Sequence, residues 1–230
     1  MPATALVRNS PITTASAPVL GADDQRAAIE PPPVGQFHSG RRVDNRPESL
    51  PCWRVSVPTV DTAAGVAQSL GGSAVPSGEN VDVLTTSPTV RIVLDGSRCV
   101  VTEMHLWGPR GLVHHCDGVL FLSPTEVRGN PCGCPTSSPE RAMLAKKLQA
   151  PQPKTTVTFR LADHYGLGRF EFSSPSRMLA DESSEIRSQL SRITGEALCE
   201  LALELVTITV SSGVDVSFRR PALKVIGPWS

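Results

Sequence analysis

The sequence has no excess of charge of either sign, because 22 Lys and Arg residues balance 22 Asp and Glu residues. A chain with a formal net charge of zero creates no long-range field that would draw it to a phosphate backbone or to an anionic membrane. The balance therefore argues against a DNA-binding protein that acts alone.

Long hydrophobic runs are also missing. A membrane-spanning helix needs about 20 consecutive apolar residues, and no run approaches that length. The N-terminus lacks the charged segment, apolar core and small-residue cleavage site of a secretory signal. The sequence therefore predicts a soluble intracellular protein that makes no contact with a membrane.

Cysteine is too sparse for a disulfide-stapled domain, since the 230 residues include six. Three of the six are isolated in apolar surroundings, where a free thiol packs as a small hydrophobic group: Cys52, Cys99 and Cys199. The other three lie with two histidines in one loop-like stretch, HHCDGVLFLSPTEVRGNPCGCP, at positions 114–135. This stretch raises the question of a metal site, a catalytic site or a structural brace.

The composition changes after the first 34 residues. Residues 1–34 are rich in Ala, Thr, Ser and Pro, contain three consecutive prolines near their end, and show no sustained apolar period. Such a segment cannot bury enough apolar surface to fold, so we expect a flexible tail. The folded domain is then expected over residues 35–230.

The first half of that domain predicts a strand, a helix and three further strands. In LPCWRVSVPTVDTAAGVAQSLGG, residues 50–72, alternating apolar residues precede a helix that begins at Thr59 or Asp61 and ends at Gly71. The face expected to be buried carries Val60, Ala64, Ala67 and Leu70. Short β-branched runs at 81–84, 89–94 and 99–107 predict strands, and Asp95-Gly96 predicts a hairpin between the last two.

The second half predicts a short helix at 141–149, two strands within 154–176, and a helix over 176–193. The following segment changes from helix-like to strand-like near Leu205 and leads to a final hairpin at Ser212 and Gly213. A strand, a proline and a helix occur in this order twice, either as a repeated unit or by chance. We therefore expect an α+β fold of small antiparallel sheets with packed helices, a pseudo-repeat of the strand–helix unit under the first interpretation, and a cysteine-rich zinc-binding loop.

Four motifs occur in an order that resembles a known family: WRVSVPTVDTAAGVAQSLGG (53–72), HLWGPRGLVHHCDG (105–118), GNPCGCP (129–135) and KTTVTFRLADHYGLGRFEFSSPS (154–176). In this order they are similar to recombination directionality factors of actinobacteriophage large serine integrases, from Pro33 to the final strand. The resemblance implies an accessory protein in the cytoplasm of the bacterial host. Such a protein binds its cognate integrase, contacts DNA only indirectly through it, and switches it from integration (attP × attB) to excision (attL × attR).

The cysteine-bearing loop predicts a structural zinc ion. Cys116, Cys132 and Cys134 are three soft ligands in polar, Gly- and Pro-rich surroundings that offer no core to bury them. The resembled family carries a further cysteine just before its KPTT motif, where this chain has Gln152 and Pro153. His115 is our candidate for the fourth ligand, His114 is the alternative, and a loop that packs without an ion remains open.

No catalytic constellation accompanies these residues. The histidines are not matched by a serine in a nucleophile elbow or by a Cys-His-Asn pattern, so we expect a protein that is not an enzyme. Interface energy concentrates in a few large side chains, and the candidates for contact with the integrase are Trp107, Leu120, Phe121 and Tyr165.

The alternative function is a small zinc-containing DNA-binding transcriptional regulator. It would need a basic face, and the most basic points of the chain are GRR at 40–42 and FRRP at 218–221. A solvated strand edge is the ordinary interpretation of both segments.

Overall fold

The structure is a computed structural model that describes residues 31–230 except 45, 147–149 and 210–212. The chain divides into two units, Met1–Pro32 and Pro33–Ser230, and every element below belongs to the second. The flexible tail expected over residues 1–34 falls almost entirely outside the described residues. Within the described part of the chain, no helix is both long enough and apolar enough to span a membrane.

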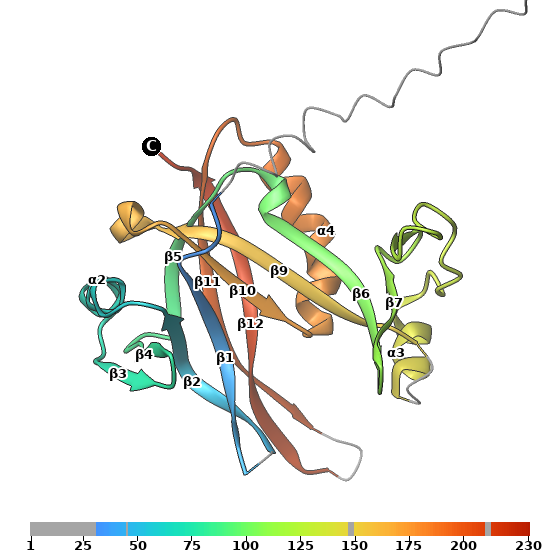
Figure 1. The fold of residues 1–230 in the computed structure, drawn as a ribbon, viewed down its shortest axis with the longest axis horizontal. Helices are drawn as coiled ribbons and strands as arrows, with labels where there is room; N and C mark the ends of the chain where they lie inside the picture. Colours follow the sequence, from blue (N-terminus) through green and yellow to red (C-terminus); the bar gives the residue numbers. More distant parts are fainter. Residues whose placement is uncertain (1–30, 45, 147–149, 210–212) are drawn as a thin grey trace, which may run out of the picture. The chain divides into compact units, whose positions relative to one another are not determined.

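A single large mixed sheet dominates the second unit (Figure 1). Nine of its strands follow the order β12-β11-β5-β9-β10-β1-β2-β4-β3, and β6, β7 and β8 extend from β9. All described pairs are antiparallel except β1 with β10. The strands are β1 (Gly35–Val43), β2 (Arg46–Val57), β3 (Ala74–Ser77), β4 (Asn80–Leu84), β5 (Thr89–Leu94), β6 (Val100–Gly108), β7 (Gly111–Cys116), β8 (Phe121–Ser123), β9 (Gln152–Leu161), β10 (Arg169–Ser174), β11 (Ala197–Thr209) and β12 (Asp215–Pro228).

Three α-helices and two 3₁₀ turns connect these strands: α2 (Val60–Leu70), α3 (Ser138–Lys146), α4 (Arg177–Ser191), η1 (Ser97–Cys99) and η2 (Ala162–Leu167). The predicted start of α2 is confirmed, because the Thr59 hydroxyl accepts a hydrogen bond from the Thr62 N–H. Its buried face differs from the expected one. Ala63 and Val66 are buried while Val60 is 66% exposed, because α2 packs toward β4 and η2.

The sheet forks at β9, and the hairpin expected at Asp95-Gly96 is wrong. Strands β5 and β6 do not pair with each other; both pair with β9, β5 near Leu161 and β6 from Val157 to Gln152. The turn η1 therefore joins two strands that follow one another along the same edge of β9. One branch continues as β11 and β12, and the other as β7 and β8.

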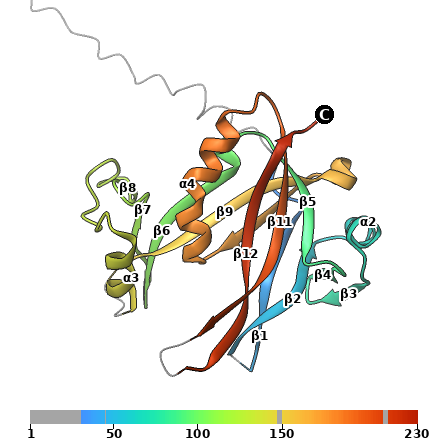
Figure 2. The ribbon, with the colours of Figure 1, turned by 180° about the vertical axis from the view of Figure 1, so that it is seen from behind.

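Helix α4 lies in the angle between the two branches (Figure 2). It contacts β12 on one side, β6 on the other, and β9 and η1 where the branches part. The helix predicted over 176–193 is confirmed: Leu179, Ile186 and Leu190 are buried on one face, and the Ser176 hydroxyl caps its N-terminus by accepting a hydrogen bond from the Leu179 N–H.

An aromatic cluster forms the centre of the core. Five rings from β1, β2, β9 and β10 contribute to it and are 2% exposed or less: Phe37, Trp53, Phe159, Phe170 and Phe172. Edge-to-face contacts at centroid distances of 5.0–5.8 Å join them. The Pro88 carbonyl accepts hydrogen bonds from Trp53 Nε1 (2.8 Å) and from the Leu203 N–H (2.9 Å), so β11 is held close to β2.

The expected α+β fold of small sheets is therefore wrong, because distant strands share one core and merge into one sheet. The segment before Leu205 is strand throughout, since alternate residues from Ala197 to Leu203 are buried and this two-residue period overrides local helix propensity. Both strand–proline–helix units exist, as β2–α2 and β10–α4. Strands β2 and β10 belong to the same sheet, and helices α2 and α4 pack against different strands.

Candidate metal centre

The register of the β6–β7 hairpin separates the two adjacent histidines. Successive side chains of a strand point to opposite faces, so His114 and Cys116 share one face of β7 while His115 lies on the other. The cross-strand pairs are Leu106 with His114, His105 with His115, and Met104 with Cys116. Two residues that look equivalent in the sequence are therefore placed in different surroundings.

The chain after β7 folds back through a tight turn at Asp117. The Asp117 carboxylate accepts hydrogen bonds from the backbone N–H groups of Leu120 (2.7 Å) and Val119 (2.8 Å), and these bonds lower the pKa of the carboxyl group. Leu120 then pairs with Pro131, and the Cys132 N–H donates to the Val119 carbonyl at 2.8 Å. This return brings Cys132 and the residue two further on, Cys134, next to Cys116.

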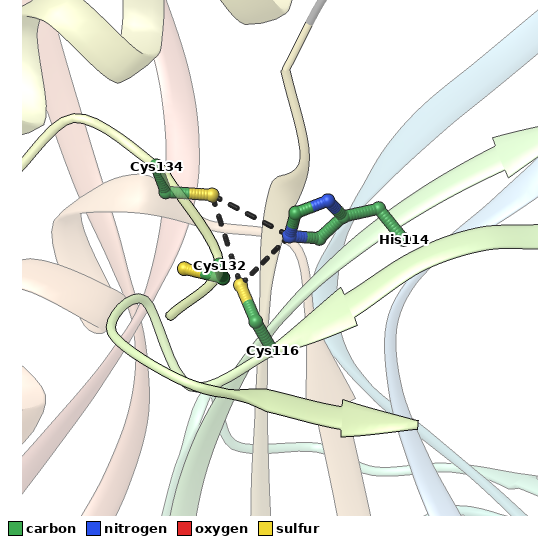
Figure 3. A group of neighbouring side chains, drawn as sticks. All are labelled: His114, Cys116, Cys132 and Cys134. Carbon is green, nitrogen blue, oxygen red and sulfur yellow. Dashed lines mark hydrogen bonds between the residues drawn. The ribbon is translucent and has the colours of Figure 1, made fainter. Parts of the chain in front are cut away.

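Four side chains converge there, and we call them the thiolate cluster: His114, Cys116, Cys132 and Cys134 (Figure 3). Their ligand atoms all lie within 4.8 Å of one another. His114 Nε2 is 3.1 Å from Cys116 Sγ and 3.5 Å from Cys134 Sγ, and the two sulfurs are 3.7 Å apart.

These separations are close to those of four ligands around one tetrahedral zinc ion. Bond lengths of about 2.3 Å to sulfur and about 2.1 Å to nitrogen place two sulfurs about 3.8 Å apart and a sulfur and a nitrogen about 3.6 Å apart. Three thiols and an imidazole are also a donor set that soft or borderline metal ions prefer. The thiolate cluster could therefore bind a metal ion, with no protein ligand missing for a closed structural site.

Burial and close neighbours favour the neutral forms of the groups in the cluster. Burial raises the pKa of the Cys116 thiol, and the neighbouring Cys132 and Cys134 raise it further; burial also raises the pKa of Cys134. Burial, with a smaller effect from His115, lowers the pKa of His114, so its ring is neutral and can offer a lone pair. A divalent cation would reverse the preference of the thiols, because thiolates are the form that binds metal.

The predicted metal ligands are thus partly brought together. The structure places the three cysteines side by side, and it places His114 with them, whereas His115 lies with Glu103 and His105 on the opposite face of the hairpin. The spacing of His114 and Cys116, two residues apart on a strand, was the signal that could have indicated this. Gln152 and Pro153 lie on β9, paired with His105 and Met104.

The predicted partner-binding residues lie in two separate places. Trp107 (67% exposed), Leu120 (38% exposed) and the half-buried Phe121 lie on the β6–β7 hairpin and the loop that follows it. The Phe121 ring packs on His114 of the thiolate cluster at 4.7 Å between centroids, whereas the Trp107 ring lies 6.3 Å from that of His105 on the opposite face. Tyr165 lies in η2, beyond the other end of β9. Its hydroxyl donates to Glu196 at 2.6 Å. Sequence reasoning missed three exposed apolar neighbours of the first group: Leu112, Val113 and Val119.

Two of the four arginines at the basic points of the sequence are paired with carboxylates within the chain. Arg41 pairs with Glu48 at 2.7 Å, and Arg220 pairs with Glu182 and Glu204 at 2.7 and 2.9 Å. The side chain of Arg42 falls outside the described ones. The Arg219 guanidinium donates to the Leu203 carbonyl at 2.9 Å, so the pairing with carboxylates reduces the positive charge that Arg41 and Arg220 offer to a phosphate backbone.

Comparison with known proteins was made for sequence families and for solved structures. No solved structure matches the chain. The model of the Gp3-like family, described as recombination directionality factor-like, matches residues 34–225, which include the whole hairpin, the thiolate cluster and nearly all of the sheet. This protein belongs to the recombination directionality factor-like family.

Proposed function

We propose that this protein is a non-enzymatic accessory factor of a phage. It binds the cognate large serine integrase in the bacterial cytoplasm and switches it from attP × attB to attL × attR recombination. Membership of the directionality-factor-like family is the observation that carries this proposal. The balanced charge and the internally paired arginines support recognition of a protein partner, with DNA reached through the integrase.

The switch acts through differential binding. A ligand can shift an equilibrium between two protein arrangements only by as much as its affinities for them differ. Reversing a strong bias takes about 5 kcal/mol of differential binding. An accessory factor needs a defined surface to supply this, and no catalytic group of its own.

The proposal includes one structural zinc ion held by His114, Cys116, Cys132 and Cys134. Every residue from 119 to 137 is exposed or half-buried, so this loop has no apolar core of its own. The ion would supply the cross-link that packing does not, as it does in small zinc-bound loops. Its role is to hold the loop in position, and it takes no part in recombination chemistry.

The surface that we propose for the integrase contact is the β6–β7 hairpin with the loop that follows it, where Trp107 and Leu120 are exposed and Phe121 packs on His114. Large exposed side chains on a rigid support are typical anchors of an interface, because little conformational entropy is lost when they bind. The hydroxyl of Tyr165 is bonded to Glu196 and its ring lies 4.8 Å from the Arg160 guanidinium, so it contributes less to the contact.

The test is recombination by the purified cognate integrase on both pairs of attachment sites, with and without this protein. We expect attL × attR recombination to depend on the protein and attP × attB recombination to be inhibited by it. Unchanged recombination of both pairs would contradict the proposal. Salt-sensitive binding to duplex DNA without integrase would favour the DNA-binding regulator instead.

A further inference from the structure

A second cluster of metal-binding side chains lies on the opposite face of the β6–β7 hairpin. Glu103 and His105 are two residues apart on β6, and His115 is the cross-strand partner of His105, so all three share one face. Their ligand atoms lie within 4.8 Å of one another. We call this the histidine–glutamate cluster. It shares no residue with the thiolate cluster.

The contacts within this cluster converge on one carboxylate oxygen. Glu103 Oε2 is 3.1 Å from His105 Nε2 and 3.2 Å from His115 Nε2, and the rings of the two histidines are 4.6 Å apart. The side chains are 13% exposed for His105, 19% for His115 and 32% for Glu103. Lys154 lies opposite Glu103 across the β6–β9 pair, but among the described residues the carboxylate pairs with the histidines.

One atom of the cluster lacks the partner that burial normally requires. His115 Nδ1 is 2.9 Å from the Ser123 hydroxyl, but His115 Nε2 is buried and makes no hydrogen bond in the described structure. When Nδ1–H donates to Ser123, Nε2 carries a lone pair that faces the Glu103 oxygen, which is also an acceptor. A cation between the two acceptors would satisfy both, and a hydroxyl that orients the far nitrogen is what metal-binding histidines usually have.

We propose that Glu103, His105 and His115 bind a divalent transition metal ion, separate from the ion of the thiolate cluster. Two imidazoles and one carboxylate form a donor set for zinc and its first-row neighbours, whereas magnesium and calcium prefer all-oxygen sites. Three protein ligands leave a coordination position open for water. A depression of about 310 Å³ lined by His105, Trp107 and Gln152 lies beside the cluster and gives that position access to solvent.

The two sites differ in a way that cobalt can report. Co²⁺ bound by thiolates has a charge-transfer band in the near ultraviolet, and Co²⁺ bound by imidazole and carboxylate lacks it. Untagged, metal-free protein is titrated with Co²⁺ while absorption and bound metal are both measured. We expect the charge-transfer band to saturate at about one equivalent and bound metal to reach about two. Saturation of both at one equivalent would overturn the proposal, leaving a hydrogen-bonded cluster without an ion.

Variants test which residues bind the second equivalent of cobalt. His115→Asn and Glu103→Gln should each lose it while the thiolate band keeps its full amplitude, and that band also shows that the hairpin is folded. His164→Asn, at a histidine in η2 away from both clusters, is the matched control and should keep both equivalents. If His115→Asn binds as much cobalt as wild type, the assignment of this site is wrong. The outcome is independent of any integrase assay.

Discussion

Cys116 has a side chain with no solvent exposure, and it lies at the start of a loop in which no residue from 119 to 137 is fully buried. A buried thiol next to two others is easily accommodated while it is protonated, but it does not tie the loop down. If the three cysteines and His114 bound one cation together, the ion would cross-link the loop. At the scale of single residues, we therefore propose that the order of this loop depends on sulfur as a metal ligand.

Replacing one sulfur tests this dependence. In Cys116→Ser, zinc affinity should fall by more than the roughly 10- to 100-fold that loss of an outer hydrogen-bond partner costs, because a direct ligand is removed. Proteases should then cleave between residues 117 and 137. Metal content and limited proteolysis measure the two effects. Cys52→Ser, at an isolated half-buried thiol, is the control and should match wild type. A Cys116→Ser protein with normal zinc and normal protection would rule out the thiolate site.

At the scale of elements, an ion pair between partly buried side chains joins β2 and β4, two strands next to α2. Asp82 on β4 accepts hydrogen bonds from Ser56 (2.5 Å) and Arg54 (2.9 Å) on β2. Burial alone would raise the pKa of Asp82, but the hydrogen bonds from Ser56 and Arg54 outweigh it and lower the pKa below its ordinary value. The carboxylate therefore stabilises the β2–β4 pair in its charged form.

The Asp82→Asn variant should be less stable than wild type by about 1–2 kcal/mol at pH 7, since hydrogen bonds to a charged group are lost. A lowered folded-state pKa gives stability that is present above the unfolded-state pKa and is lost as pH falls through the folded-state value. The difference between variant and wild type should therefore shrink below the ordinary pKa of 3.8. Denaturant unfolding at several pH values measures it, with exposed Glu79→Gln as control. A difference that is constant down to pH 2 would contradict the assignment.

The connection from α2 to β3 depends on a glycine. Gly72 has a φ of 93°, and a Cβ there would overlap the carbonyl oxygen of Leu84. Gly72→Ala should lower the free energy of unfolding by about 2–4 kcal/mol, the sum of left-handed strain and backbone displacement. Gly78→Ala is the matched control, because it has a φ of 62° with open space around it, and should cost about 1 kcal/mol. Equal costs in denaturant unfolding would show that the Leu84 contact does not matter.

At the scale of the whole molecule, local pattern predicted elements better than it predicted their pairing. The alternating strand before α2, the N-cap of α2 at Thr59, and the helix and strands expected within 154–193 follow from neighbouring residues, and the structure confirms them. The fork at β9 does not follow, because it joins strands about 60 residues apart in sequence. The metal centre was likewise only partly predictable, because its geometry depends on strand pairing. Three cysteines were predictable, but the choice between His114 and His115 required the register of β6 on β7.

We propose that one branch of the fork, the one that contains β6 and β7, carries the recognition surface. The β6–β7 hairpin carries exposed Trp107, and the far ends of β11 and β12 carry other exposed apolar residues, such as Leu205 at 63%. Both residues lie on the surface, so truncation of either should leave folding intact. Only the first lies on the surface that we propose for the integrase.

The most direct measurement is therefore attL × attR recombination by the cognate integrase, titrated with wild-type protein, Trp107→Ala and Leu205→Ala. We predict that Trp107→Ala needs at least about tenfold more protein for half-maximal recombination, since a central aromatic anchor is worth about 2 kcal/mol or more, while Leu205→Ala matches wild type. Wild-type activity of Trp107→Ala, or an equal loss in both variants, would contradict the proposal that the surface of the β6–β7 hairpin carries the integrase contact.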